Sequence, residues 1–271
     1  MKKKGIALVE RQYLFPFVLI TSLFFLWGFA HAILDVLNKH FQELLTITRT
    51  HSAMIQATMY MGYFIMAIPA GLFINRHGYR KGVVLGLLLY GIGSLLFIPG
   101  QYIASFNMFL FSLFVIGCGL TFLETAANPY VTELGARETA ASRLNFAQSF
   151  NGLGCIFAPI LTGLLLFSDD DKGASGNVAL PYAVMGVIVL LAALAFMRVR
   201  LPEIPHEEEV DSEGHRVGLW SHKLFVFGLV ALFAYEVSEI SINSFFINYV
   251  TEVGWMNARD ASLVLSFGGL G

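Results

Sequence analysis

The chain has 271 residues, of which 56% are hydrophobic and 13% charged, and its mean hydropathy is +0.67. This balance excludes an ordinary soluble globular domain and indicates a lipid bilayer as the solvent. A net charge of -2 and a pI near 6.4 provide no strongly basic surface for nucleic acid. Cys118 and Cys155 lie in apolar runs, where we expect thiols to act as small hydrophobes without chemistry.

Seven segments are long and apolar enough to cross a membrane, since a helix needs about 20 such residues. They run approximately from Leu14 to Phe41, Ser52 to Ile74, Gly82 to Gly100, Phe106 to Val131, Arg143 to Phe167, Leu180 to Met197 and His222 to Val250. An eighth begins near Asn257, and the sequence ends at Gly271 before this run reaches membrane length. The predicted fold class is an all-α membrane protein, and we expect the chain to be incomplete.

The stretch from 201 to 221 differs from the apolar segments around it. It holds two prolines and the acidic run Glu207, Glu208, Glu209, a composition typical of a solvated linker. The predicted organisation is therefore a six-helix bundle at 1–200, a cytoplasmic linker at 201–221 and the start of a second bundle at 222–271.

Basic residues predict the orientation, because Lys and Arg accumulate on the cytoplasmic side. A cytoplasmic N-terminus leaves only Lys39, Arg49, Lys172 and Arg259 outside or near the outer ends. The basic residues placed inside are then Lys2, Lys3, Lys4, Arg11, Arg76, Arg80, Lys81, Arg137, Arg143, Arg198, Arg200, Arg216 and Lys223. We expect a multi-pass protein of the bacterial inner membrane with an uncleaved first span.

Ionisable groups inside the predicted spans are His31, Asp35, Glu124, Glu236 and Glu239. Such groups are costly at bilayer depth, so each is a candidate functional residue. The alternative is an acid that snorkels to the interface or is tied to a neighbouring helix. For Glu236 that alternative is as strong as a functional role.

Amides accompany these acids at helical spacing. Asn128 lies one turn after Glu124 and directly before the helix-bending Pro129, and Asn243 lies one turn after Glu239. In span five the amides of Gln148 and Asn151 share one face. Their alternative role is to hold neighbouring spans together by hydrogen bonds.

The class of ligand follows partly from the absence of any mid-span Lys or Arg, which would leave an anionic substrate without a counter-charge. Carboxylates and amides suit the hydroxyls of a neutral polyol, and Phe24, Phe25, Trp27 and Tyr235 offer flat faces for a sugar ring. An organic cation would suit the same acids. These two ligand classes remain open at this point.

Asp35 has a second possible role. Burial raises the proton affinity of a carboxyl, which could then carry a coupling proton; His31, one turn earlier, could tune that proton or merely be a hydrogen-bonded neighbour. Gly28 and Gly117 each stand seven residues before an acid, Asp35 and Glu124. This spacing indicates that spans one and four are equivalent members of an inverted repeat.

The loop GLFINRHGYRKG, from Gly71 to Gly82, resembles the loop pattern of the major facilitator superfamily. Asn75 stands where an aspartate is usual, which replaces a charge relay by a hydrogen bond. The residues of this gating loop are Gly71, Asn75, Arg76, Gly78, Arg80 and Lys81.

More specific runs are LETAANPYVTELG at 123–135, SRLNFAQSFNGLG at 142–154 and YEVSEISINSFFINY at 235–249. They resemble the L-fucose/proton symporter family, and the last is closer to its glucose/galactose branch. The resemblance implies a major facilitator fold and proton-coupled hexose uptake. It implies that Asp35 binds the coupling proton, that Glu124 recognises the sugar and that Gln148 and Asn151 line the sugar cavity. Asn128, one turn after Glu124, and Glu239, on the acid of the span-seven pattern, complete the expected substrate-binding residues.

The expected partners are a small sugar, H+ or Na+, and the lipid bilayer, and we expect a monomer without metal, cofactor or nucleic acid. Two alternatives are an organic-cation/proton antiporter and a non-transporting membrane sugar sensor. An enzyme is not expected, because no nucleophile with a base and no metal-ligand set lies at bilayer depth. Since alternating access needs two bundles, we do not expect these 271 residues alone to transport.

Overall fold

The computed structural model describes residues 8–45, 49–103, 105–166, 179–199, 220 and 222–268, and every regular element within them is helical. The α-helices are α1 (Leu14–Leu45), α2 (Arg49–His77), α3 (Tyr79–Leu95), α4 (Phe97–Ile103), α5 (Phe106–Glu133), α6 (Ala140–Leu166), α7 (Ala179–Arg198), α8 (Lys223–Glu252) and α9 (Ala258–Gly268). Two 3-10 turns, η1 (Arg11–Tyr13) and η2 (Arg137–Thr139), precede α1 and α6. The predicted all-α class is confirmed.

The predicted spans agree with these helices to within a few residues, with one difference. The third span is interrupted at Leu96, so that α3 is followed by the short helix α4. Among the described residues, six helices are long and apolar enough to cross a membrane. The predicted fifth span corresponds to α6, which is helical from Ala140 to Leu166.

A glycine and two capping residues explain where several of the helices begin and end. Gly78 alone separates α2 from α3 and has a φ of 83°, a conformation that glycine adopts without strain. Ser105 caps α5 by accepting a hydrogen bond from the backbone N–H of Met108. Asn257 caps α9 in the same way by accepting from the N–H of Asp260 at 2.8 Å.

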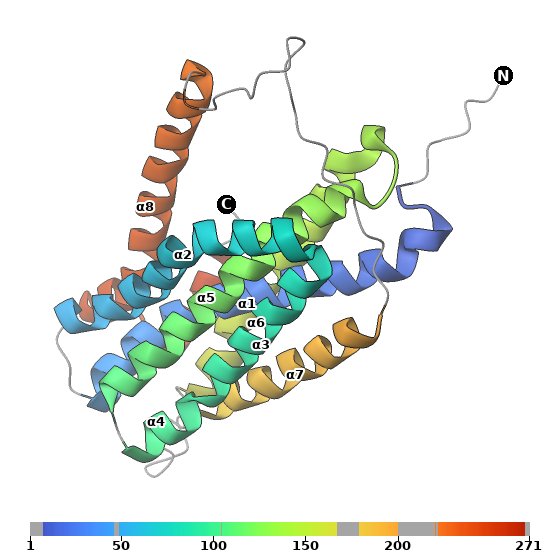
Figure 1. Cartoon of the computed structure of the whole chain (residues 1–271). Helices are drawn as coiled ribbons and strands as arrows, with labels where there is room; N and C mark the ends of the chain where they lie inside the picture. Colours follow the sequence, from blue (N-terminus) through green and yellow to red (C-terminus); the bar gives the residue numbers. More distant parts are fainter. Residues whose placement is uncertain are drawn as a thin grey trace.

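Most of the helices form one bundle, shown in Figure 1. In it α1 packs along α6, α2 along α5, and α3 between α5 and α7. The described part of α8 begins away from the bundle and is largely exposed, whereas its last turns pack against α1 and α9. The helices α1, α2, α5 and α6 therefore present one face of the bundle to α8 and α9.

Two helix crossings in the bundle have the same pattern of close contacts. A Cβ on Gly28 of α1 would lie under 3.0 Å from the carbonyl of Asn151 on α6. A Cβ on Gly117 of α5 would lie equally close to the carbonyl of Met59 on α2. Because Gly28 and Gly117 each stand seven residues before an acid, the paired contacts support the predicted inverted repeat.

Replacing Gly28 with alanine should lower the melting temperature, because the added methyl group collides with backbone rather than with a movable side chain. Overpacking of this kind costs about 1–3 kcal/mol. Gly152→Ala on α6 is the matched control, since a Cβ there meets nothing within 4 Å. The measurement is thermal unfolding of both variants in detergent, and equal melting temperatures would show that the α1–α6 crossing tolerates a side chain.

Candidate functional site

A cavity of about 420 Å³ lies between α1, α2, α5 and α6 on one side and α8 and α9 on the other. Its volume is within the range of small-molecule sites. We refer to it as the central cavity. Its polar, ionisable and aromatic lining residues are Trp27, His31, Gln56, Tyr60, Tyr63, Glu124, Asn151, Cys155, Glu236, Glu239 and Asn243. No Lys or Arg is present among the described residues that line it.

Glu124 on α5 is half-buried and lies where two hollows meet. It lines the central cavity and also a recess between α2 and α5, which Asn128 lines as well. The sequence placed Glu124 and Asn128 on one face, and the structure brings both to the α2–α5 recess. Only Glu124 also reaches the central cavity.

The two predicted amides of α6 have different positions. Asn151 lines the central cavity, and its Nδ2 donates to the carbonyl of Phe24 on α1 at 3.3 Å. Gln148 is exposed, and its Nε2 donates to Oδ1 of Asn128 at 3.4 Å. Both amides thus link helices, and Asn151 in addition faces the cavity.

Cys155 is less buried than its apolar surroundings in the sequence indicated. It is half-buried and lines the central cavity one turn after Asn151. Its Sγ lies 3.5 Å from the carbonyl oxygen of Gly28 and donates to it. The thiol therefore forms part of the wall beside a predicted sugar-binding residue.

The helix α8 contributes Glu236, Glu239 and Asn243 to the central cavity. These three residues follow at intervals of three and four, so they share one helix face. The structure brings Glu239 together with Glu124 and Asn151, as the predicted site requires. It adds Glu236, which the sequence alone left undecided.

The wall formed by α2 was missed at the sequence level. Gln56, Tyr60 and Tyr63 line the cavity at helical spacing, but none is ionised at neutral pH and none was singled out. The inverted repeat could have predicted a role for Gln56, because it relates this residue to Gln148. It stands three residues before Met59, just as Gln148 stands three before Asn151.

Of the four aromatic residues proposed as sugar platforms, Trp27 lines the central cavity. Phe24 is buried behind it, with ring centroids 5.9 Å apart. Phe25 faces a separate groove against Phe157, and Tyr235 on α8 is 56% exposed. The expected aromatic wall therefore exists, but tyrosines of α2 complete it.

Asp35 belongs to α1, one turn after His31, so its backbone position is as predicted. Its side chain lies outside the described part of the structure. The assignment of the coupling proton to Asp35 stays a prediction. The linker at 201–221 also lies outside the described residues, except for Trp220.

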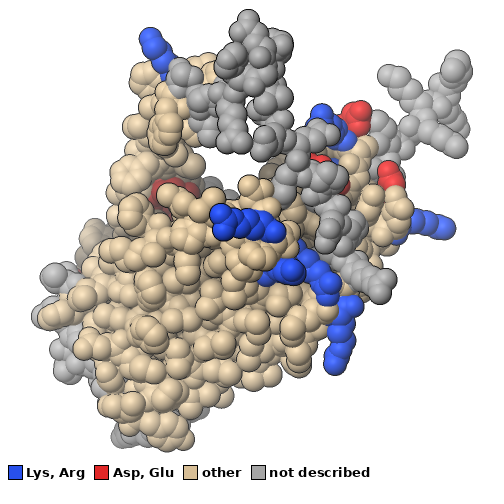
Figure 2. Space-filling view, viewed as in Figure 1, with Lys and Arg blue, Asp and Glu red and all other residues tan. Residues whose placement is uncertain are grey.

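The predicted gating loop surrounds the junction of α2 and α3. Asn75, Arg76 and Lys81 are exposed there, and Figure 2 shows blue Lys and Arg side chains around this end of the visible face. Arg80 has a specific partner. Its Nε donates to the carbonyl of Phe196 at 3.2 Å, and its Nη2 donates to the carbonyl of Met197, so Arg80 caps the end of α7.

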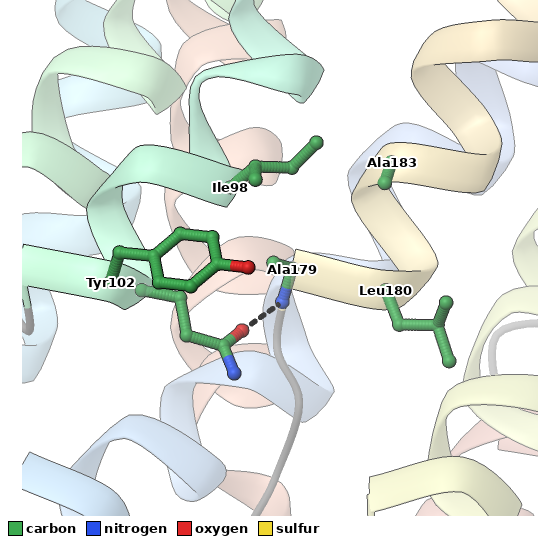
Figure 3. A pocket seen from close by; sticks show the side chains of 6 residues that line it. Ile98, Tyr102, Ala179, Leu180 and Ala183 are labelled. Atoms are coloured by element: carbon green, nitrogen blue, oxygen red, sulfur yellow. Dashed lines mark hydrogen bonds between the residues drawn. The ribbon is translucent and has the colours of Figure 1, made fainter.

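Two other hollows lack the ionisable side chains of the central cavity. One lies between α4 and α7 and is lined by Ile98, Tyr102, Ala179, Leu180, Ala183 and Gln101 (Figure 3). There the Gln101 side chain accepts a hydrogen bond from the backbone N–H of Ala179 at 2.8 Å, which caps α7. The other is an apolar groove of about 1110 Å³ between α1, α6 and α7.

The model of the Major Facilitator Superfamily matches residues 17–271. The chain belongs to the Major Facilitator Superfamily. This membership confirms the family and the fold that the loop and span motifs indicated.

Within the superfamily, a glucose/galactose transporter of Brucella abortus is 35% identical over 259 residues, covering 93% of this chain and 63% of that protein. An L-fucose-proton symporter of Escherichia coli is 34% identical over 282 residues, covering 95% of this chain and 64% of that protein. The chain thus spans about two-thirds or less of these relatives. The crystal structure of the E. coli fucose:proton symporter superposes with a TM-score of 0.70 at 31% identity, covering 96% of this chain and 68% of that one.

Proposed function

We propose that the complete gene product imports a neutral hexose together with protons by alternating access. The lining of the central cavity carries this proposal. Three carboxylates and three amides face the aromatic rings of Trp27, Tyr60 and Tyr63, and no described Lys or Arg lines the cavity. Paired donors and acceptors suit sugar hydroxyls, while the rings suit the apolar face of a pyranose.

The relatives support the same substrate class. Those that match most of this chain at about 35% identity are named as a glucose/galactose transporter and an L-fucose-proton symporter. We propose that Glu124, Asn151 and Glu239 bind the sugar directly. Gln148 and Asn128, which bond to each other beside the cavity, join the site in another state of the transport cycle.

We propose that Asp35 carries the coupling proton. Its position on α1, one turn after His31, places its backbone on the helix that forms one wall of the cavity. We further propose that the gating loop closes the cytoplasmic side, with Asn75 supplying a hydrogen bond in place of a charge. Arg80 would hold α7 while Arg76 and Lys81 remain exposed for a partner helix.

The proposed topology is that of a monomer in the bacterial inner membrane with a cytoplasmic N-terminus. A six-helix bundle at 1–200 and a second bundle starting at 222 would be joined by a cytoplasmic linker at 201–221. Clustering of Arg76, Arg80 and Lys81 at one end of the bundle supports this orientation, since such residues accumulate on the cytoplasmic side.

The test is uptake of a panel of labelled hexoses by reconstituted vesicles, with and without a proton uncoupler, together with thermal protection by each sugar. We expect one or more free hexoses to be concentrated, and the uncoupler to abolish the concentration. Free hexoses should protect against heat, and sugar phosphates should not, because no described Lys or Arg lines the cavity to bind a phosphate. Uptake of an organic cation but of no sugar would establish the antiporter instead, and sugar binding without any flux would favour a sensor.

A further inference from the structure

Three aromatic residues on one wall of the central cavity are joined by hydrogen bonds. Trp27 and His31 lie one turn apart on α1, and Tyr63 lies opposite them on α2. The ring centroid of His31 is 5.9 Å from that of Trp27 and 5.6 Å from that of Tyr63. All three residues line the cavity.

The hydrogen bond of His31 determines its tautomer. Nδ1 lies 3.2 Å from the backbone carbonyl of Trp27. A carbonyl oxygen can only accept, so Nδ1 carries the hydrogen, and the Nε2 of the neutral ring is then an acceptor. Among the described residues, no hydrogen bond to Nε2 is present. The cavity therefore receives a hydrogen-bond acceptor from His31.

The hydrogen bond that Tyr63 accepts leaves its own O–H available as a donor. The indole Nε1 of Trp27 donates to the Tyr63 hydroxyl oxygen at 3.1 Å. An indole N–H cannot accept, so the phenolic hydrogen of Tyr63 is not used in this bond. Within the described part of the chain, that O–H has no acceptor. Tyr63 therefore presents a donor beside the acceptor of His31.

Trp27 orients both groups. Its backbone carbonyl holds the imidazole and its indole N–H holds the phenol, so neither ring can turn without losing a hydrogen bond. A single hydroxyl is the complement of such a pair, because a hydroxyl both donates and accepts.

We propose that His31 and Tyr63 together bind one hydroxyl of the transported sugar and make that hydroxyl a requirement for recognition. The sugar hydroxyl donates to Nε2 of His31 and accepts from the O–H of Tyr63. This inference rests on the proposed hexose transport. It assigns to the α1–α2 wall a subsite that lies beside Glu124 of α5, since Tyr63 and Glu124 line the same hollows.

The test is binding of the best-transported hexose and of its monodeoxy derivatives to the complete gene product in detergent. In the wild type, the derivative that lacks the recognised hydroxyl should bind roughly ten- to a hundredfold more weakly, since it leaves a buried donor and acceptor unmet. Tyr63→Phe and His31→Phe should each weaken binding of the parent sugar toward the affinity of the deoxy derivative. The same deoxy sugar should then bind within about threefold of the parent, because the lost interaction cannot be lost twice.

Tyr182→Phe is the control, because Tyr182 stacks on Phe97 away from the cavity, and it should retain the wild-type ratios. His31→Leu, which also lacks the acceptor, provides a second variant if His31→Phe does not fold. Wild-type deoxy ratios in Tyr63→Phe or in the His31 variant that lacks the acceptor would overturn the pairing. If the wild type binds no hexose, the proposed function fails first and this inference with it.

Discussion

Changing Glu124 to alanine will reduce sugar counterflow and proton-driven uptake together. Glu124 is half-buried where the central cavity meets the α2–α5 recess, so its loss removes acceptors that a bound hydroxyl needs. An unmet buried hydrogen bond costs about 1–3 kcal/mol, or roughly ten- to a hundredfold in Kd. Both activities are measured in vesicles that contain the complete gene product.

Asp35→Asn is the informative contrast to Glu124→Ala. The amide resembles a protonated carboxyl, so sugar exchange should survive while uphill uptake disappears. Glu138→Ala on the exposed turn η2 provides a control for loss of an acid outside the cavity. Wild-type sugar affinity in Glu124→Ala would show that Glu124 does not bind the sugar. Wild-type concentrative uptake in Asp35→Asn would show that Asp35 does not carry the coupling proton.

Hydropathy predicted most of the fold because a bilayer imposes a minimum apolar length on each span. The interruption at Leu96 was not predictable in this way, since the apolar run continues through it into α4. In α6 the amides of Gln148 and Asn151 bond to Asn128 on α5 and to the carbonyl of Phe24 on α1, so polar residues of this span link neighbouring helices.

In the candidate site, the residues recognised from the sequence were those whose burial in a membrane is costly. Glu124 and Glu239 stood out because a charge in an apolar run requires an explanation. Gln56, Tyr60 and Tyr63 did not, because such side chains are common in helices that merely pack. Only the packing of α2 against α1 and α5 shows that they share a cavity with the acids.

The same limit applies to Arg143, which was counted from the sequence as one of many cytoplasmic positive charges. The structure buries it completely. Its Nε donates to the carbonyl of Val131 at 3.0 Å and its Nη2 to that of Thr132, at the end of α5. Its Nη1 donates to the carbonyls of Ala136 at 3.0 Å and Leu8 at 3.2 Å.

A positive side chain is well placed at the end of α5, where the last carbonyls of a helix lack donors and carry partial negative charge. The guanidinium supplies donors to α5, to the connection before α6 and to the segment before α1. Gly135 makes room for it, because a Cβ there would lie 2.9 Å from Nη1 of Arg143. Arg143 thus fixes α5 relative to α6, the helices that carry Glu124 and Asn151.

Arg143→Met should therefore destabilise the protein more than any other single loss of a basic residue at this end. Hydrogen bonds to charged groups are worth about 1.5–3 kcal/mol each, and losing several should cost at least about 3 kcal/mol. In a chain of this size, that corresponds to a fall in melting temperature of roughly 6–12 °C. Arg143→Lys should recover part of the loss, since a lysine keeps the charge but has fewer donors in another geometry.

Thermal unfolding in detergent measures this effect, with Arg76→Met as the control. Arg76 is exposed at the end of α2, so its replacement should change the melting temperature by no more than about 2 °C, because exposed substitutions stay within about 0.5 kcal/mol. The order of stability should then be wild type and Arg76→Met first, Arg143→Lys next and Arg143→Met last. If Arg143→Met has the same melting temperature as Arg76→Met, the carbonyls at the end of α5 find other donors. The buried guanidinium then does not hold α5 against α6.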